Sequence, residues 1–227
     1  MEKIFTFWEG DMPDYIKLCM CTWNFDYVLL NYSNLNDYTN LDISKIKKFT
    51  LPQVSDIVRV HVLRDNGGIW TDADTIMIGN SLPKENMVGV PEERGAHCGY
   101  LNFEKEHPML VEWAENQDRV INSSTNQLDW DAFCNSFSDK YIKEHEDITI
   151  CPRKNIVPES YMIRDDNTKQ QYLKFYFENK YHLNDIEPTK MLMLHNSWTP
   201  AWYKAMSEIE IFNSNCTMSN ILKEVSL

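Results

Sequence analysis

Residues 51–79 read LPQVSDIVRVHVLRDNGGIWTDADTIMIG. Apolar side chains recur at helical spacing from Leu51 to Asp65, which predicts a buried amphipathic helix. Gly67-Gly68 is expected to end that helix, because glycine adopts positive φ without steric cost. The next three residues, Ile69-Trp70-Thr71, predict a short buried strand. The segment therefore predicts a helix, a glycine turn and a strand in succession.

Two aspartates, Asp72 and Asp74, follow at the point where this strand is expected to end. Side chains at i and i+2 of an extended segment lie on the same side, so the two carboxylates are expected to face one way. Two neighbouring carboxylates are unfavourable unless a proton or a cation neutralises them. Mg2+ or Mn2+, bound through oxygens with sites left for phosphate, is the simplest neutraliser. The pair therefore predicts a divalent metal site.

The composition indicates a folded globular protein. The chain has 227 residues, 43% of them apolar and 25% charged, which suits one substantial domain. Its 22 Lys and Arg against 34 Asp and Glu give a net charge of −12. Such a field repels nucleic acid and anionic lipid, so nucleic acid is not expected as a partner. A phosphate-bearing ligand would need a local metal ion or arginine.

The sequence predicts a cytoplasmic protein. No apolar run approaches the roughly 20 residues that span a bilayer, and the apolar stretch near the start is too short for a signal peptide. Six cysteines show neither a Cys-x-x-Cys nor a paired Cys/His spacing, and they are predicted to be buried free thiols. They are Cys19, Cys21, Cys98, Cys134, Cys151 and Cys216.

The start of the chain predicts a βαβ unit. A strand is expected over residues 3–8, a helix beginning near Pro13 and a second strand over residues 26–31, which favours a parallel sheet. Later strands are expected at residues 87–90, 97–101, 148–151 and 191–194, and later helices from Pro108, over residues 127–141 and over residues 170–181.

Asp56 and Arg59 lie three residues apart on the central helix, so their side chains are neighbours. One interpretation is a surface ion pair worth a few tenths of a kcal/mol. The other is a polar site within an otherwise apolar helix face. Both stay open from the spacing alone.

Three blocks of this sequence together resemble one family. The central block is Ser55-Asp56-x-x-Arg59, Leu63, Gly67-Gly68, Trp70 and Asp72-x-Asp74. The opening block is Lys3-Ile4-Phe5-x-Phe7-Trp8-x-Gly10 with Pro13, and the closing block is His195-Asn196-Ser197-Trp198. The combination resembles the Asp-x-Asp glycosyltransferases of the capsular polysaccharide synthesis and glycosyltransferase family 32 type. Residues 104–184 contain no motif that can be aligned with this family.

The resemblance implies a GT-A fold, which is a Rossmann-like, mostly parallel central sheet flanked by helices in a single α/β domain over residues 1–227. Residues of about 1–100 would bind the nucleotide-sugar, and residues of about 101–227 would supply acceptor-side and closing elements. The implied activity is metal-dependent transfer of a sugar from a UDP- or GDP-sugar to a glycan or lipid-linked glycan acceptor in capsular or surface polysaccharide synthesis. Relatives retain the anomeric configuration, and peripheral contact with the inner face of the membrane is a further expectation.

The resemblance also assigns roles residue by residue. Trp8 would stack on the base, and Asp56 and Arg59 would hold the ribose or the donor sugar near Trp70. Asp72 would touch the sugar and reach Mn2+ or Mg2+ mainly through water, whereas Asp74 would bind the metal directly. His195, Ser197 and Trp198 would close over the diphosphate, with His195 a further candidate metal ligand. The catalytic residues implied are Asp72, Asp74 and Arg59.

Simpler interpretations stand beside these roles. For Trp8 and Trp198 the alternative is a place in the core, the more frequent fate of tryptophan, and for His195 it is a hydrogen-bonded strand end without a ligand. His61 and His97 are expected to be packing residues, and Asp165-Asp166 a solvated turn.

Two other functions remain open from the sequence. Residues 72–76 fit the Asp-x-Asp-x-Thr motif of haloacid-dehalogenase phosphatases, with Asp72 as the nucleophile. That motif normally follows the first strand, however, and Lys84 lies too close to serve as its lysine. The other alternative is a non-catalytic nucleotide-sugar-binding module.

Overall fold

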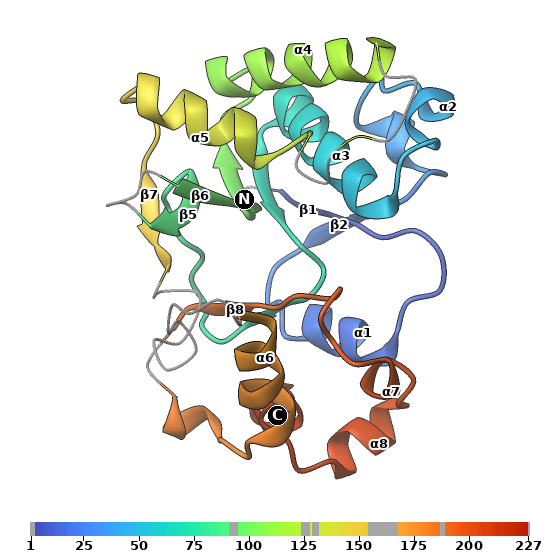
Figure 1. Ribbon diagram of the computed structural model, residues 1–227, viewed down its shortest axis with the longest axis vertical. Helices are drawn as coiled ribbons and strands as arrows, with labels where there is room; N and C mark the ends of the chain where they lie inside the picture. The colour runs from blue at the N-terminus through green and yellow to red at the C-terminus, as the bar shows by residue number, and fades with distance from the viewer. Residues whose placement is uncertain are drawn as a thin grey trace. The chain divides into compact units, whose positions relative to one another are not determined.

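The computed structural model describes residues 3–90, 95–123, 128, 132–153, 168–186 and 189–226 (Figure 1). Its contacts group the chain into two compact units, each built from three separate segments. The first unit comprises residues 1–10, 26–72 and 83–152, and the second comprises residues 11–25, 73–82 and 153–227. The chain passes from the first unit to the second between the two aspartates of the Asp-x-Asp pair.

The first unit contains a six-stranded sheet in the order β2-β1-β3-β6-β5-β7. The strands are β1 (Ile4–Phe7), β2 (Tyr27–Leu30), β3 (Gly68–Thr71), β5 (Met87–Val90), β6 (Gly95–Phe103) and β7 (Ile150–Pro152). β1 pairs in parallel with both β2 and β3, and β5 pairs in parallel with β7. β6 runs antiparallel to its two neighbours, β3 and β5. This mostly parallel, helix-covered sheet confirms the predicted α/β class.

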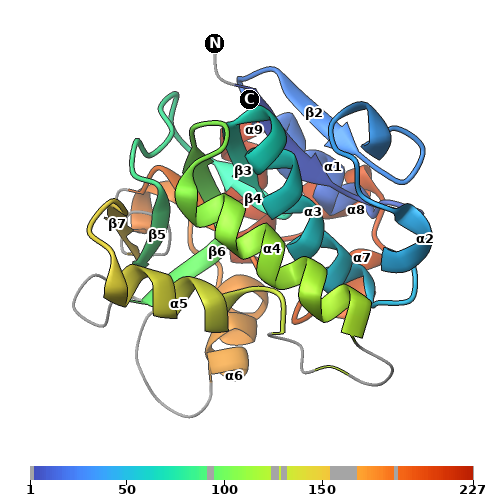
Figure 2. The same ribbon diagram turned by 90° about the horizontal axis from the view of Figure 1, so that it is seen from above.

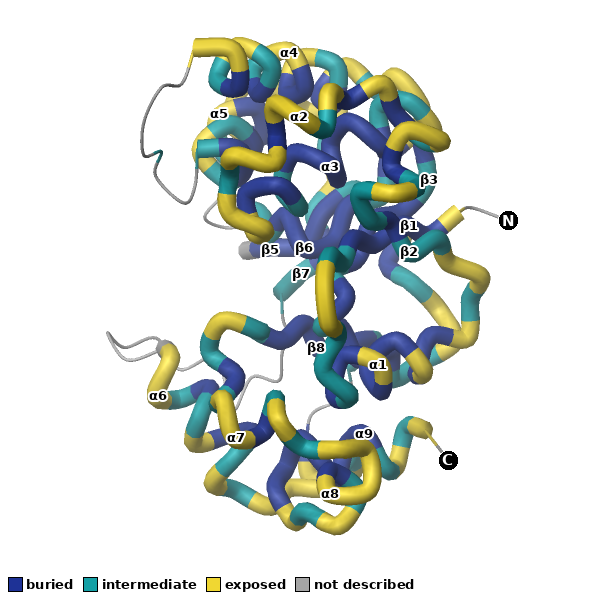
Figure 3. Tube along the Cα trace, turned by 90° about the vertical axis from the view of Figure 1, so that its right-hand side faces the viewer, coloured by how far each residue is buried: buried dark blue, intermediate teal, exposed yellow. Residues whose placement is uncertain are grey.

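The buried helix of the first unit is α3 (Leu51–Asn66). A capping box stabilises its first turn: the side chain of Gln53, the third helical residue, accepts a hydrogen bond from the Thr50 N–H at 3.1 Å. The tube in Figure 3 is buried along most of α3. Gly67 and Gly68 end it with φ values of +68° and +100°. A Cβ on Gly68 would lie 2.5 Å from the Lys3 carbonyl oxygen, so the predicted turn requires glycine there.

Three further helices accompany α3: α2 (Ile43–Ile46), α4 (Pro108–Ser123) and α5 (Asn135–Glu144). α3 packs against β1 and β3, and α4 lies along its other side, as Figures 1 and 2 both show. α4 buries Leu110 and Trp113 in the core, as its apolar spacing predicts, while Val111 is half-buried. α3 is therefore enclosed between the sheet and α4.

The second unit is mainly helical. Its two-stranded sheet pairs β4 (Thr75–Met77) antiparallel with β8 (Met191–Met193). Its helices are α1 (Asp14–Cys21), α6 (Thr168–Leu173) with a π-helical continuation (Lys174–Glu178), α7 (Ala201–Lys204), α8 (Glu208–Asn213) and α9 (Thr217–Ser226). The helix between the parallel strands β1 and β2 thus belongs to the second unit.

Several element boundaries differ from those predicted. The helix expected over residues 127–141 begins at Asn135, after residues that are partly outside the described ones, and the helix expected to reach residue 181 ends at Glu178. The expected turn at Asp165-Asp166 lies outside the described residues. No helix among the described residues is long and apolar enough to cross a membrane. The extent of a single domain over residues 1–227 stays a prediction.

Candidate functional site

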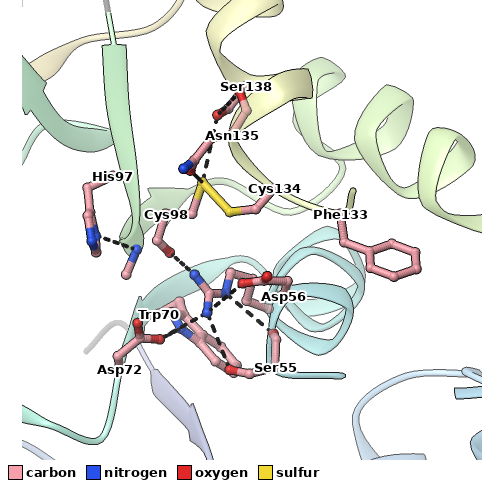
Figure 4. A network of polar contacts seen from close by, with 12 residues as sticks. Ser55, Asp56, Trp70, Asp72, His97, Cys98, Phe133, Cys134, Asn135 and Ser138 are labelled. Carbon is pink, nitrogen blue, oxygen red and sulfur yellow. Dashed lines mark hydrogen bonds and ion pairs between the residues drawn. A yellow bond between two sulfur atoms is a disulfide. The ribbon is translucent and has the colours of Figure 1, made fainter. Parts of the chain in front are cut away.

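Arg59 is the centre of a buried polar network in the first unit (Figure 4). Its side chain is only 7% exposed, and its Nη2 atom lies 3.0 Å from Asp56 Oδ1 and 3.2 Å from Asp72 Oδ1. Nη1 donates to the Cys98 carbonyl oxygen at 2.5 Å. The same guanidinium therefore connects α3, the end of β3 and β6. This geometry excludes the surface ion pair as the explanation of the 56/59 spacing.

Trp70 supports the same carboxylate from the sheet. Its indole N–H donates to Asp72 Oδ1 at 2.9 Å, and its ring lies 5.4 Å from the Arg59 guanidinium carbon. Trp70 is fully buried, and its indole N–H orients Asp72. The Asp72 side chain is 28% exposed. It is thus held firmly through one oxygen and still reaches solvent.

Two cysteines beside this network are joined, contrary to the prediction of six free thiols. Cys98 of β6 forms a disulfide with Cys134, immediately before α5. The other four cysteines form no disulfide in the described part of the chain; Cys19, Cys151 and Cys216 are buried and Cys21 is exposed. The pairing could not be derived from the sequence, because it depends on α5 lying against β6. The prediction therefore fails for the cysteines at positions 98, 134 and 21.

Asp74 belongs to the second unit, where backbone groups hold it. Its Oδ2 atom accepts a hydrogen bond from the Asn196 N–H at 2.7 Å, and its carbonyl accepts one from Leu194 N–H at 3.1 Å. Asn196 is fixed in turn by Tyr15, whose hydroxyl donates to Asn196 Oδ1 at 2.5 Å. Burial and, secondly, the negative Asp74 raise the pKa of Tyr15, so this phenol stays protonated. Asp74 and the closing block are therefore neighbours.

A basic residue that the sequence did not single out, Lys204, interacts electrostatically with Asp74. Burial lowers the pKa of Lys204, and the nearby negative charge of Asp74 opposes that shift. Lys204 lies at the end of α7, eight residues beyond Asn196. A lysine in an unassigned helical tail gives no motif from which it could have been predicted.

The closing block forms a turn with aromatic packing. The His195 carbonyl accepts from the Trp198 N–H at 2.9 Å, and the two rings lie 4.0 Å apart between centroids. Tyr172, in α6, packs edge-on against both rings. His195 and Trp198 are half-buried, whereas Ser197 is exposed. The block thus combines a fixed turn with an accessible hydroxyl.

The reasoning that placed the two carboxylates on one side of a strand is wrong. β3 ends at Thr71 and β4 begins at Thr75, and a turn includes Ala73 and Asp74. Alternation along a strand does not apply in a turn, and the chain turns here because β3 and β4 belong to different sheets. Asp72 and Asp74 are close in the sequence, but this closeness alone does not make their carboxylates point the same way.

The other predicted residues have simple positions. Trp8 follows β1 and is half-buried, and its backbone N–H donates to the Leu30 carbonyl at 3.0 Å. His97 accepts the Gly99 N–H through Nδ1 at 3.0 Å, in keeping with a structural role. His61 is buried as expected, on the α3 face toward α4. Within the described part of the chain, no three His, Cys, Asp or Glu side chains cluster so as to bind a metal.

Comparison with known proteins identifies the family. A family model described as "Capsular polysaccharide synthesis protein" matches residues 1–183. The chain belongs to this family. The matched residues of this chain include Arg59, Asp72 and Asp74, whereas the closing block lies beyond them.

More distant similarities are limited in extent. Lactosylceramide 4-alpha-galactosyltransferase of Mus musculus and that of Rattus norvegicus are each 33% identical to this chain over 63 residues. Those residues are 28% of this chain, and they span only 18% of the length of each curated relative.

Two solved structures also match. PaToxG Glycosyltransferase gives a TM-score of 0.46 at 14% identity, covering 62% of this chain and 67% of that one. The apo-form glycosyltransferase GlyE of Streptococcus pneumoniae TIGR4 gives a TM-score of 0.48 at 12% identity, covering 93% and 62%. These values are too low to add to the family match.

Proposed function

We propose that this protein is a glycosyltransferase that moves a sugar from a nucleoside-diphosphate sugar to a glycan acceptor in capsular or surface polysaccharide synthesis. The observation that carries the proposal is the Arg59 network, which holds a part-exposed Asp72 two residues before Asp74. Family membership supports the polysaccharide role. The local similarity to proteins named as galactosyltransferases supports sugar transfer.

The donor set fits a divalent cation that is shared with a diphosphate. Mg2+ commonly binds through one or two carboxylates and completes its shell with phosphate oxygens and water. Asp74 and Asp72 are the residues that would hold Mn2+ or Mg2+, with His195 as the further candidate. When bound, the cation would supply positive charge to the departing diphosphate. A UDP- or GDP-sugar donor and a glycan or lipid-linked glycan acceptor belong to the same proposal.

The proposal also assigns roles to other side chains. Arg59 and Asp56 would hold hydroxyls of the ribose or donor sugar, and Lys204 would add positive charge near Asp74. Trp8 would stack on the base, and the Ser197 hydroxyl and Trp198 would contact the diphosphate. We propose transfer with retention on the front face of the sugar, in which the departing phosphate accepts the proton of the acceptor hydroxyl.

A nucleotide-sugar hydrolysis assay tests the proposal. The purified protein is incubated with Mn2+ and a panel of UDP- and GDP-sugars, and release of nucleoside diphosphate is measured. We expect slow hydrolysis of one donor class, abolished in Asp74→Asn and strongly reduced in Asp72→Asn. Asp37→Asn, on an exposed 3-10 turn, is the matched control and should retain wild-type turnover.

Three results would contradict the proposal. Wild-type turnover by Asp74→Asn would remove the role of that carboxylate. Hydrolysis of p-nitrophenyl phosphate without nucleotide-sugar turnover would indicate the phosphatase chemistry of the Asp-x-Asp-x-Thr motif. A rise in melting temperature with a donor, but no turnover with any acceptor or with water, would indicate a binding module.

A further inference from the structure

A cavity of about 290 Å³ lies among α2, α3 and α4 within the first unit. Its polar lining includes Asp42, Lys45, His61, Arg64, Asp118 and Asn122, and its apolar lining is Leu41, Ile46 and Ile121. No residue of the Arg59 network lines it. Asp56 and Arg59 belong to the side of α3 that faces Asp72, whereas His61 and Arg64 belong to the side that faces α4. The cavity is therefore separate from the candidate active site.

His61 carries an unsatisfied polar atom next to this cavity. The residue is 2% exposed, and its Nε2 atom has no hydrogen-bond partner. Asp118 Oδ1 lies 3.7 Å from that atom, which is too far for a hydrogen bond. Burial, reinforced by the Arg64 charge, lowers the pKa of His61 to about 3, so the ring is neutral and the contact is not an ion pair. A buried polar atom without a partner is unfavourable, and a ligand group could satisfy it.

The charged groups around the cavity are mostly compensated by the protein itself. Arg64 pairs with Asp65 at 2.7 Å, and Lys45 Nζ donates to Asn122 Oδ1 at 3.0 Å. Asp42 caps α2 by accepting the Ser44 N–H at 3.0 Å. Two aspartates against one lysine and one arginine leave the lining without net charge when His61 is neutral. The cavity therefore offers hydrogen bonds rather than a strong field of either sign.

We propose that this cavity binds a neutral polyhydroxylated ligand of the size of one pyranose ring. A hydroxyl placed between His61 and Asp118 can accept a hydrogen bond from the imidazole and donate one to the carboxylate. Asp118 is half exposed, so its side chain can turn to admit that hydroxyl without a change in the backbone. Leu41, Ile46 and Ile121 supply apolar surface for the C–H face of a sugar ring.

The lining of the cavity disfavours both inorganic phosphate and a divalent cation. Inorganic phosphate would meet the carboxylates of Asp42 and Asp118, which repel it. A divalent cation would meet Lys45 and Arg64, and the described residues contain no group of three ligands for it. A ligand with several hydroxyls avoids both costs. This inference does not depend on the proposed transfer reaction, because it concerns residues outside that site.

The test is a titration of the full chain with monosaccharides, without nucleotide or metal. The probes are glucose, galactose, mannose and N-acetylglucosamine, each as the free sugar and as its methyl α- and β-glycosides. Binding is followed by calorimetry and by the side-chain NMR resonances of the histidines. We expect saturable binding in the millimolar range that shifts the His61 ring resonances. Glycosides that bind as well as free sugars would indicate one unit of a glycan, and preference for the reducing sugar would indicate a free monosaccharide.

Variants of the lining decide whether this cavity is the site. Asp118→Ala and His61→Leu should each weaken binding about tenfold or more, because each removes one hydrogen-bond partner of the hydroxyl. Glu115→Ala, at an exposed position earlier in α4, is the matched control and should bind like the wild type. Asp72→Asn should also bind the sugar normally, even where it loses nucleotide-sugar turnover. Failure of the transfer reaction and failure of this inference are thereby separate results.

Several outcomes would overturn the inference. One is that no saccharide shifts the His61 resonances, which would leave the cavity to water alone. Another is that Asp118→Ala binds sugar as tightly as the wild type does. Competition by inorganic phosphate or by MnCl2 would replace the polyhydroxylated class with an ion.

Discussion

Replacing Arg59 with leucine tests the buried network most directly. The guanidinium is 7% exposed and faces two carboxylates, Asp56 and Asp72, whose side chains are 14% and 28% exposed. Leucine fills much of the same volume but leaves both carboxylates, and the Cys98 carbonyl, without their partner. The loss should therefore exceed that of an ordinary surface ion pair, which is worth about 0–1 kcal/mol.

The expected destabilisation is about 3–5 kcal/mol, the usual cost of removing one partner of a buried ion pair. Against a typical unfolding free energy of about 5–15 kcal/mol, this is a large fraction of the stability. Arg59→Lys should cost about 1–3 kcal/mol, because one ammonium cannot span two carboxylates and the Cys98 carbonyl as a planar guanidinium does. Lysine keeps the positive charge of Arg59 but loses the planar arrangement of its hydrogen-bond donors.

Urea denaturation of each variant measures this free energy. The m-value should stay constant if only stability changes. Arg119→Leu, the same substitution at an exposed position of α4, should change stability by less than about 0.5 kcal/mol. Asp72→Asn should cost less in the Arg59→Leu background than alone, with a coupling energy of about 0.5–3 kcal/mol. Additive effects, or a loss below about 1 kcal/mol for Arg59→Leu, would refute the network as a source of stability.

Three further predictions concern other parts of the chain. Gly68→Ala should destabilise the protein by about 1–3 kcal/mol in urea, because φ is +100° and its Cβ would meet the Lys3 carbonyl, whereas Gly79→Ala meets nothing within 4 Å and should be tolerated. Between pH 7 and pH 5 the unfolded state should take up a proton at His61 that the folded state, with a pKa of about 3, does not. Lowering the pH from 7 to 5 should therefore reduce the free energy of unfolding by about 2 kcal/mol more in the wild type than in His61→Gln. An equal reduction in both proteins would contradict this. Trp8→Ala should weaken nucleoside diphosphate binding by roughly 1–3 kcal/mol in calorimetry, with Trp202→Ala as the control, and unchanged affinity would return Trp8 to a packing role.

The sequence predicts the centre of the fold well, because the signals there are local. Helical spacing, a capping residue and two glycines define α3 and its end, and the structure confirms both. The parallel pairing of β1 with β2 follows from a strand, a helix and a strand in close succession. The antiparallel β6 has no comparable signal, because its direction depends on pairing with β3 across more than twenty residues of chain.

The candidate site is only partly readable for the same reason. The spacing of Asp56 and Arg59 predicts their contact, whereas the addition of Asp72 and of the Cys98 carbonyl requires the packing of α3 on the sheet. The Asn196 N–H that holds Asp74 is invisible to motif analysis, because a backbone donor carries no residue signature. Lys204 and the Cys98–Cys134 disulfide likewise depend on tertiary packing.

The two aspartates are not equivalent, and the hydrogen bonds on each explain the difference. Asp72 Oδ1 receives both the Arg59 guanidinium and the Trp70 indole N–H, two donors that lower its capacity to share charge with a cation. Asp74 accepts the backbone N–H of Asn196 through Oδ2, and it also interacts electrostatically with Lys204. The Asp72 oxygen that Arg59 and Trp70 hold would therefore be less available to a cation bound as proposed. This asymmetry supports the proposed division of roles, in which Asp74 binds the metal directly and Asp72 also contacts the sugar.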